Sequence, residues 1–219
     1  MERRHPCLRF ARILARIYFM TRLSQSRELK LGWHSRGYLP HFEGGELAQF
    51  ITFRLYDSLP RELLIRWKAE LKLQRNEQTQ SVMRRRVEAY LDQGYGSCFL
   101  RNPGIAEMVQ NALLFHDQAK YRLIAWVVMP NHVHMLCTPR PGESLAGIMH
   151  SVKSFTSSEA NKLLNRSGRF WQKEYFDRYI RNAKQFARTV AYIENNPVKA
   201  NLCERPEDWP FSSARFRKK

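Results

Sequence analysis

The stretch Trp126-Val-Val-Met-Pro-Asn-His-Val-His-Met-Leu-Cys137 carries two imidazoles within a hydrophobic segment. Alternate side chains of a strand share one face, so His132 and His134 would project together, roughly 7 Å apart along the strand. Two neutral imidazoles on one face are suitable ligands for a divalent cation. A half-buried strand with two solvent-facing histidines would produce the same local pattern, so the rest of the sequence has to decide.

Outward from this stretch, the hydrophobic pattern predicts four strands and several helices. The strands are expected at residues 49–55, 121–129, 132–138 and 176–181. The helices are expected at residues 102–114, 144–164 and 184–195, with two more at 61–75 and 80–92. The order is βαββαβ and predicts an α+β fold: a ferredoxin-like (RRM-like) antiparallel sheet with helices on one face, plus a C-terminal helix. The pair at 61–92 is expected to be a helical insertion after the first strand.

Charge is the strongest compositional signal. The 219 residues include 37 Lys and Arg against 20 Asp and Glu, which gives a net charge of +17. Such a chain attracts polyanions, so nucleic acid is the expected partner, ahead of an anionic membrane surface. No apolar run approaches the ~20 residues of a membrane span. The four cysteines are scattered without a Cys-x-x-Cys pair, which favours a reducing cytoplasm over a disulfide scaffold.

A metal with two histidine ligands needs further oxygen or nitrogen donors and a reacting group. The expected last helix offers candidates for both in the segment Val190-Ala-Tyr-Ile-Glu-Asn-Asn-Pro-Val198. Tyr192 and Asn196 are four residues apart, so a phenol and an amide would share one helix face, about 6 Å apart. Pro197 disfavours helical geometry at Asn196, which is expected at a fraying end. Tyr175 and Tyr179 are also candidate nucleophiles, but packing explains a strand tyrosine more readily.

Several motifs in order give the chain a close resemblance to the REP-associated tyrosine transposases, which are single-tyrosine members of the HUH endonuclease superfamily. These motifs span most of residues 32–213: Gly32-Trp-His-Ser-Arg-Gly-Tyr-Leu-Pro-His41, Trp126-Val-Val-Met-Pro-Asn-His-Val-His134, Phe170-Trp-Gln172, Asp177-Arg178, Tyr192-Ile-Glu-Asn-Asn-Pro-Val198 and Asp208-Trp-Pro-Phe-Ser-Ser213. The resemblance implies an endonuclease and strand transferase that cleaves and rejoins single-stranded, REP-like hairpin DNA through a 5′-phosphotyrosine.

The same resemblance implies residue roles. Tyr192 is the expected nucleophile, and His132, His134 and Asn196 are the expected ligands of Mg²⁺ or Mn²⁺. Imidazole ligands by themselves would favour Mn²⁺ or a later metal over Mg²⁺. The family reads its hairpin partly through the segment ahead of the first strand. Recognition of DNA is accordingly assigned there to His34, Arg36 and Tyr38. Anchoring of an N-terminal arm is the alternative role for these three residues.

Many basic residues lie in the sequence between the expected strand of His132 and His134 and the expected helix of Tyr192. They can contact the phosphates of a DNA backbone. The residues assigned to nucleic-acid binding there are Lys153, Arg169, Lys173, Arg178 and Arg181. The triple arginine at 84–86 in the expected insertion is either a solvated face or a phosphate contact, and the pattern alone does not separate the two. The expected partner is single-stranded or hairpin DNA, with the protein acting as a monomer or a homodimer, in the cytoplasm and associated with the nucleoid.

Three segments are expected along the chain: a basic N-terminal extension and DNA-recognition arm (1–47), a single transposase domain (48–213) with its helical insertion at about 60–95, and a basic tail (214–219). The main alternative function is a domesticated relative that binds DNA or RNA as a regulator without cutting it. A zinc hydrolase using the two histidines ranks last, because no general-base motif is apparent and the net charge would be unexplained.

Overall fold

The fold was obtained as a computed structural model, which describes residues 32–35, 40–43, 45–73 and 79–217. Its centre is a four-stranded sheet of β3 (Gln49–Arg54), β4 (Tyr121–Val128), β5 (His132–Pro139) and β6 (Phe176–Tyr179). The strand order is β4-β5-β3-β6, and each neighbouring pair is antiparallel. The expected hairpin is confirmed, since β4 pairs with β5 and the Met129 amide donates to the His132 carbonyl at 2.9 Å.

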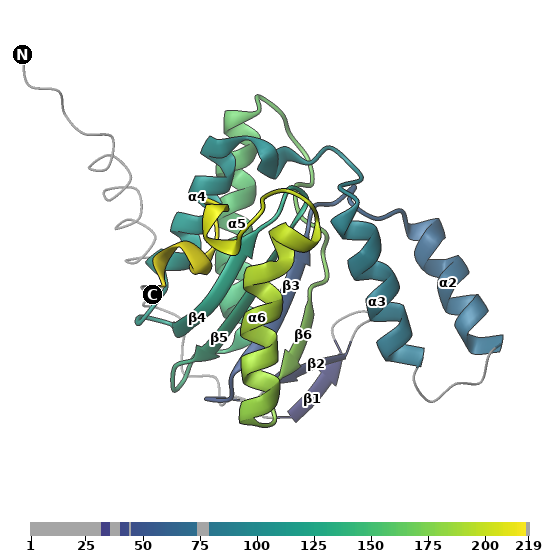
Figure 1. The fold of residues 1–219 in the computed structure, drawn as a ribbon, viewed down its shortest axis with the longest axis horizontal. Helices are drawn as coiled ribbons and strands as arrows, with labels where there is room; N and C mark the ends of the chain where they lie inside the picture. The colour runs from purple at the N-terminus through teal and green to yellow at the C-terminus, as the bar shows by residue number, and fades with distance from the viewer. Residues whose placement is uncertain (1–31, 36–39, 44, 74–78, 218–219) are drawn as a thin grey trace, which may run out of the picture.

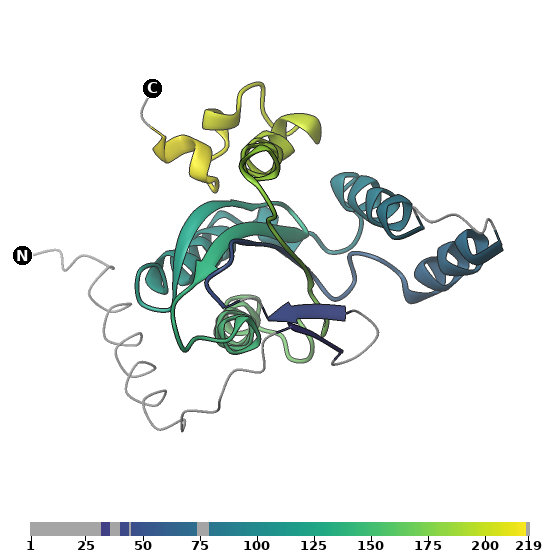
Figure 2. The same cartoon turned by 90° about the horizontal axis from the view of Figure 1, so that it is seen from below.

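Helices cover both faces of this sheet (Figures 1 and 2). On one face, α4 (Pro103–Phe115) and α5 (Leu145–Leu163) bury the larger hydrophobic core against β3, β4 and β5. On the other face, α6 (Ala183–Lys199) packs on a smaller apolar cluster that includes Phe50, Val127 and Leu136. The period-2 alternation of the strands therefore sends one set of side chains under α4 and α5 and the other set toward α6.

The expected helical insertion forms α2 (Arg61–Leu73) and α3 (Thr79–Asp92), which lie beside the sheet (Figure 1). Three short 3₁₀ helices complete the described part of the chain: η2 (Phe99–Arg101), η3 (Pro206–Asp208) and η4 (Ser213–Phe216). The segment before η4 returns to the sheet, where Ser212 bridges Val127 of β4. No helix in the described part of the chain is both long and apolar enough to cross a bilayer.

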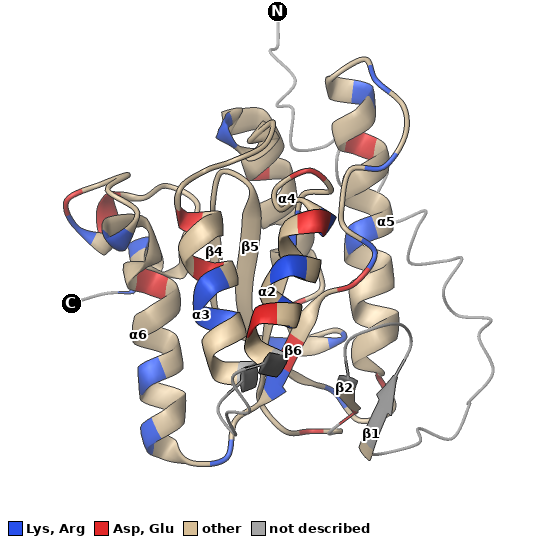
Figure 3. Cartoon of the chain, turned by 90° about the vertical axis from the view of Figure 1, so that its right-hand side faces the viewer, with Lys and Arg blue, Asp and Glu red and all other residues tan. Residues whose placement is uncertain are grey.

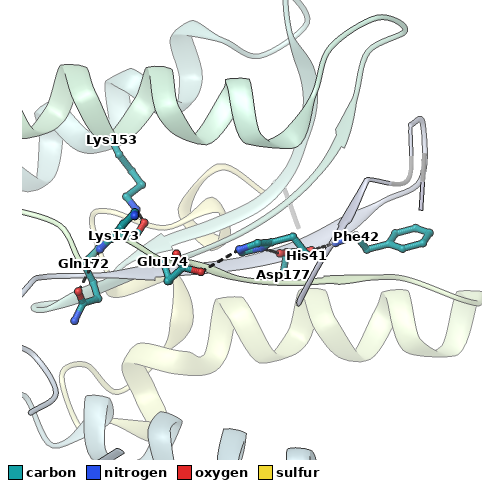
Figure 4. A network of polar contacts seen from close by, with 7 residues as sticks. All are labelled: His41, Phe42, Lys153, Gln172, Lys173, Glu174 and Asp177. Carbon is teal, nitrogen blue, oxygen red and sulfur yellow. Dashed lines mark hydrogen bonds and ion pairs between the residues drawn. The ribbon is translucent and has the colours of Figure 1, made fainter. Parts of the chain in front are cut away.

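Ahead of the sheet, β1 (Gly32–Ser35) and β2 (Pro40–Glu43) form a two-stranded antiparallel ribbon. A polar network attaches β2 to β6 (Figure 4). The His41 ring is hydrogen bonded to Asp177 and lies 3.3 Å from a carboxylate oxygen of Glu174, while the Phe42 amide donates to Asp177 at 2.9 Å. Three of these residues, His41, Glu174 and Asp177, are buried, so the ribbon is joined to the sheet by a desolvated network.

The expected fraying of the last helix at Asn196 is wrong. Helix α6 continues through Pro197 to Lys199, and the amide of Ala200 donates to the Asn196 carbonyl at 3.0 Å. Asn196 and Pro197 are both buried, and Ile193 one turn earlier belongs to the apolar cluster under α6. Packing against the sheet and the hydrogen bonds of the last turn therefore outweigh the local cost of the proline.

Candidate active site

Two buried histidines of β5 face helix α6. Their even positions put them on the α6 side of the sheet, whereas Val133 between them enters the core under α4 and α5. The Nε2 atoms of His132 and His134 lie 3.1 Å apart, and each residue is only 1% exposed. The structure thus brings the two imidazoles together, and the alternative of two solvent-facing histidines is wrong.

Each imidazole is held in place at its other ring nitrogen. The Nδ1 atom of His132 lies 2.7 Å from the side-chain oxygen of Asn131, and Nδ1 of His134 lies 2.7 Å from the Thr52 hydroxyl. An amide oxygen can only accept a hydrogen bond, so Nδ1 of His132 carries the proton and Nε2 carries the lone pair. This tautomer is the one that a metal ligand bound through Nε2 requires.

Burial keeps both imidazoles neutral. It lowers the pKa of His132 to about 3, with smaller contributions from the cations Lys199 and Arg54. Burial, followed by His132 itself, also lowers the pKa of His134 well below its ordinary value. At physiological pH the pair therefore presents neutral nitrogen donors, which is the metal-binding form of histidine.

Tyr192 of α6 brings its hydroxyl to this pair. The Tyr192 oxygen lies 3.4 Å from Nε2 of His134, and the phenol ring packs edge-on against Phe50 with centroids 5.9 Å apart. Burial raises the pKa of Tyr192, and the carboxylates of Glu88 and Asp92 on α3 raise it further. The hydroxyl is therefore protonated at neutral pH, and its ionisation would need a positive charge close by.

Asn196 lies one helical turn beyond Tyr192 and is buried on the same helix. Within the described part of the chain, neither its amide oxygen nor its amide nitrogen makes a hydrogen bond of normal geometry, although both atoms are shielded from solvent. The amide is still close enough to the Tyr192 hydroxyl to lower the pKa of that phenol, against the larger effect of burial. A buried amide without partners is costly, so this side chain is suited to a ligand that supplies the missing contact.

The donor set fits a divalent cation. The 3.1 Å between the two histidine nitrogens is about the separation of adjacent ligands that each lie ~2.1 Å from one ion. Among the described residues, no group of three or more His, Cys, Asp and Glu could hold a metal. A third protein donor would therefore have to be of another type, such as the unpartnered amide oxygen of Asn196.

A basic cavity of about 740 Å³ opens beside Tyr192. It is bounded by α3, β6, α6 and Phe50 of β3. The residues that line it are Phe50, Arg84, Glu88, Arg178, Arg181, Asn182, Lys184, Gln185, Arg188, Thr189 and Tyr192. Figure 3 shows the basic residues that α3 and the first half of α6 carry. Five cations in the wall suit a phosphate-bearing ligand, and the expected nucleophile lies in the same wall.

The basic residues assigned to nucleic-acid binding divide between two sites. Arg178 and Arg181 line the cavity beside Tyr192. The other three line a different cavity of about 440 Å³, beside α5 and the segment that precedes β6: Lys153, Arg169 and Lys173. The structure therefore brings only part of the predicted DNA-binding set to the candidate nucleophile.

Lys153 has a structural contact in this second cavity. Its ammonium group donates hydrogen bonds to the main-chain carbonyls of Gln172 and Lys173, both at 2.7 Å, and so connects α5 to the segment before β6 (Figure 4). Burial lowers the pKa of Lys153 to about 8. Two of the N–H donors of the Lys153 ammonium group are therefore already used within the protein.

The three residues assigned to hairpin recognition fall where less of the structure is described. The backbone of His34 belongs to β1, where it pairs with His41, but its side chain is not described. Arg36 and Tyr38 lie outside the described residues. Their assigned roles stay predictions.

Sequence reasoning passed over residues that shape the site. Asn131 and Thr52 hold the two imidazoles, and Glu88 reaches the wall beside Tyr192 from the insertion. The position of Asn131 directly before His132 in the sequence could have indicated that its side chain contacts this imidazole. Thr52 has no such signal, because its register against His134 is a property of the folded sheet.

Comparisons with known proteins agree with this geometry. Residues 103–196, which contain both histidines, Tyr192 and Asn196, match the family model described as "Transposase IS200 like". That part of the chain is therefore similar to the IS200-like transposases. The resemblance to the REP-associated tyrosine transposases is also confirmed. One of these, from Escherichia coli (strain K12), is 33% identical over 110 residues, which are 49% of this chain and 63% of that protein.

Two further similar proteins extend the comparison. A putative REP-associated tyrosine transposase from Haemophilus influenzae is 29% identical over 103 residues, which are 42% of this chain and 58% of that protein. A solved structure described as "Structure of the REP associates tyrosine transposase bound to a REP hairpin" is 20% identical, covers 83% of this chain and 84% of that chain, and has a TM-score of 0.49. The chain thus spans less than two thirds of the length of both curated relatives.

Proposed function

We propose that this protein is a metal-dependent transposase that cleaves and rejoins single-stranded, REP-like hairpin DNA through a covalent 5′-phosphotyrosine on Tyr192. The observation that carries the proposal is the position of the Tyr192 hydroxyl, 3.4 Å from Nε2 of His134 in a buried pair of imidazoles. The match of residues 103–196 to the IS200-like family model supports it, as does the 33% identity to the REP-associated tyrosine transposase of Escherichia coli. The strand order β4-β5-β3-β6, which is that of a ferredoxin-like sheet, is also consistent with it.

The chemistry is a transesterification at phosphorus. The Tyr192 oxygen forms a bond to the scissile phosphorus, the bond from phosphorus to the 3′ oxygen breaks, the phenol loses a proton and the 3′ oxygen gains one. Attack by a 3′ hydroxyl on the phosphotyrosine reverses these changes and joins strands, so no nucleoside triphosphate is consumed. The number of phosphodiester-type bonds is conserved at each step.

The protein's own residues position the reactants. Packing against Phe50 restricts the phenol of Tyr192, and the neighbouring basic cavity holds the negatively charged strand. Asn131 and Thr52 fix the planes of the two imidazoles. His132, His134 and Asn196 would hold Mg²⁺ or Mn²⁺, which supplies Lewis-acid stabilisation of charge at the scissile phosphate and close to the phenol oxygen.

A covalent-adduct assay tests the proposal. Purified protein is mixed with end-labelled hairpin DNA carrying a single-stranded flank and Mg²⁺ or Mn²⁺, and denaturing electrophoresis reveals a protein-linked label. Wild type should form the adduct and Tyr192→Phe should not, because phenylalanine lacks the attacking oxygen. Tyr175→Phe is the matched control and should retain the adduct. An undiminished adduct in Tyr192→Phe would remove the mechanism.

The histidine variants separate chemistry from binding. His132→Ala or His134→Ala should abolish the adduct while salt-sensitive DNA binding persists, since the lining arginines remain. If wild type forms no adduct with either metal but still binds DNA or RNA in EDTA, the non-cleaving regulator is the correct function instead.

A further inference from the structure

The three consecutive arginines of the insertion have three different environments. Arg84 lines the cavity beside Tyr192, and Arg85 is exposed outside its lining. Arg86 donates a hydrogen bond to Glu70 of α2 at 2.6 Å, which joins the two insertion helices. The triple arginine is therefore neither a uniform solvated face nor a uniform phosphate contact, and only its first member reaches the candidate active site.

Two buried guanidinium nitrogens in this cavity wall make no hydrogen bond. Within the described chain, neither Nε of Arg84 nor Nε of Arg178 has a hydrogen-bond partner, although both atoms are shielded from solvent. Arg84 Nε forms an ion pair with Glu88 at 3.5 Å, but this long contact is not a hydrogen bond. Buried charged donors without acceptors are costly, so both atoms are suited to an oxygen-rich ligand.

The two arginines also oppose each other electrostatically. Burial lowers the pKa of Arg178, and Arg84 is the next largest cause. The two side chains come from different elements, α3 and β6, yet line one cavity with Tyr192. An anion in that cavity would offset their mutual repulsion and accept from both, and a phosphodiester carries the charge and geometry that guanidinium groups prefer.

We propose that Arg84 of the helical insertion and Arg178 of β6 form a clamp for a phosphodiester of the DNA strand that reaches Tyr192. The proposal rests on the proposed function for the identity of that strand. The insertion is then one wall of the active site, and Arg84 is a binding residue for the substrate backbone. Glu88, one turn along α3, pairs with Arg84 and so holds its side chain at the cavity.

Arg84→Gln and Arg85→Gln form a matched pair of variants. Both remove one positive charge from the same helix, but only Arg84 lines the cavity. The full chain carries Tyr192→Phe in each case, so that the strand is bound without being cut. Fluorescence anisotropy measures the affinity for a labelled single-stranded DNA across a series of salt concentrations with Mg²⁺ present.

Arg84→Gln should weaken binding roughly ten-fold or more and reduce the slope of log affinity against log salt by about 0.7, the loss expected for one phosphate contact to a single strand. Arg85→Gln should leave the slope unchanged. Arg84→Lys keeps the charge and should preserve the slope while losing affinity, because lysine lacks the planar fork. Equal slopes for Arg84→Gln and Arg85→Gln would overturn the clamp.

The covalent adduct distinguishes this inference from the proposed function. If the protein with its native Tyr192 forms the adduct while the Arg84→Gln slope matches that of Arg85→Gln, the clamp is overturned and the transposase stands. If no adduct forms but the slope falls only in Arg84→Gln, the clamp stands as a phosphodiester site and the transposase mechanism fails. Circular dichroism and thermal melting of each variant identify any loss of binding that follows unfolding.

Discussion

Replacing Asn131 by alanine should destabilise the protein far more than the loss of one exposed amide. Asn131 is 0% exposed and makes three hydrogen bonds. Its amide nitrogen donates to the main-chain carbonyls of Leu91 at 3.2 Å and Tyr95 at 3.0 Å, and its oxygen lies 2.7 Å from Nδ1 of His132. One side chain therefore connects the hairpin of β4 and β5 with the end of α3.

The expected magnitude follows from these contacts. A buried hydrogen bond contributes roughly 1 kcal/mol net, and each partner left without one adds to the cost. Three bonds lost together in Asn131→Ala should lower the free energy of unfolding by about 3 kcal/mol. Asn131→Asp should cost more, because it keeps an acceptor for His132 but places a carboxylate against the carbonyls of Leu91 and Tyr95.

Urea unfolding followed by circular dichroism measures these changes. Asn195→Ala is the matched control, because Asn195 is exposed and its amide donates only within α6, to the Ala191 carbonyl at 2.8 Å. That variant should stay within ~0.5 kcal/mol of wild type. A loss below ~1 kcal/mol for Asn131→Ala, or the same loss in both alanine variants, would refute the assigned role of the Asn131 side chain.

Two further predictions concern the hydroxyl that holds His134 and the network around His41. Thr52→Val should weaken Mn²⁺ binding roughly 10- to 100-fold, as measured by calorimetry, while Thr52→Ser should retain it. Equal Mn²⁺ affinity of Thr52→Val and wild type would contradict the role of the Thr52 hydroxyl in orienting His134. The hydrogen bond to Asp177 raises the pKa of His41, so its stabilisation is complete below the ordinary value of 6.5 and is lost as pH rises through the raised pKa. Between about pH 6 and about pH 9, the melting temperature should fall more steeply for wild type than for His41→Gln. Parallel curves of melting temperature against pH would show that the His41 network does not cause the loss of stability.

Local patterns predicted the centre of the fold well. The alternation around His132 and His134 indicated a strand, and the proline-asparagine step indicated its hairpin, because both signals act within a few residues. The spacing of Tyr192 and Asn196 likewise put both on one helix. Only the end of that helix was wrong, since burial of Pro197 is a tertiary effect that a local rule for proline does not include.

Local sequence patterns could not predict which distant residues lie close together in the folded chain. The basic residues from 153 to 188 are close in sequence, yet Lys153 and Arg178 line different cavities. Lys153 belongs to α5, which covers one face of the sheet, whereas the side chain of Arg178 in β6 lines the cavity beside α6 on the other face. The sequence predicted a helix at residues 80–92 but gave no indication of what it would pack against. The approach of Arg84 and Glu88 to Tyr192 therefore became apparent only in the folded chain.

The insertion is joined to the candidate active site at two points, so its position affects the geometry of that site. Asn131 bonds to the carbonyls of Leu91 and Tyr95 with its nitrogen and orients His132 with its oxygen. At the other point, Lys199 of α6 forms an ion pair with Asp92 of α3 at 2.6 Å. A displacement of α3 would thus change the imidazole plane and the position of α6 together, so substitutions in the insertion should alter the proposed cleavage without touching DNA.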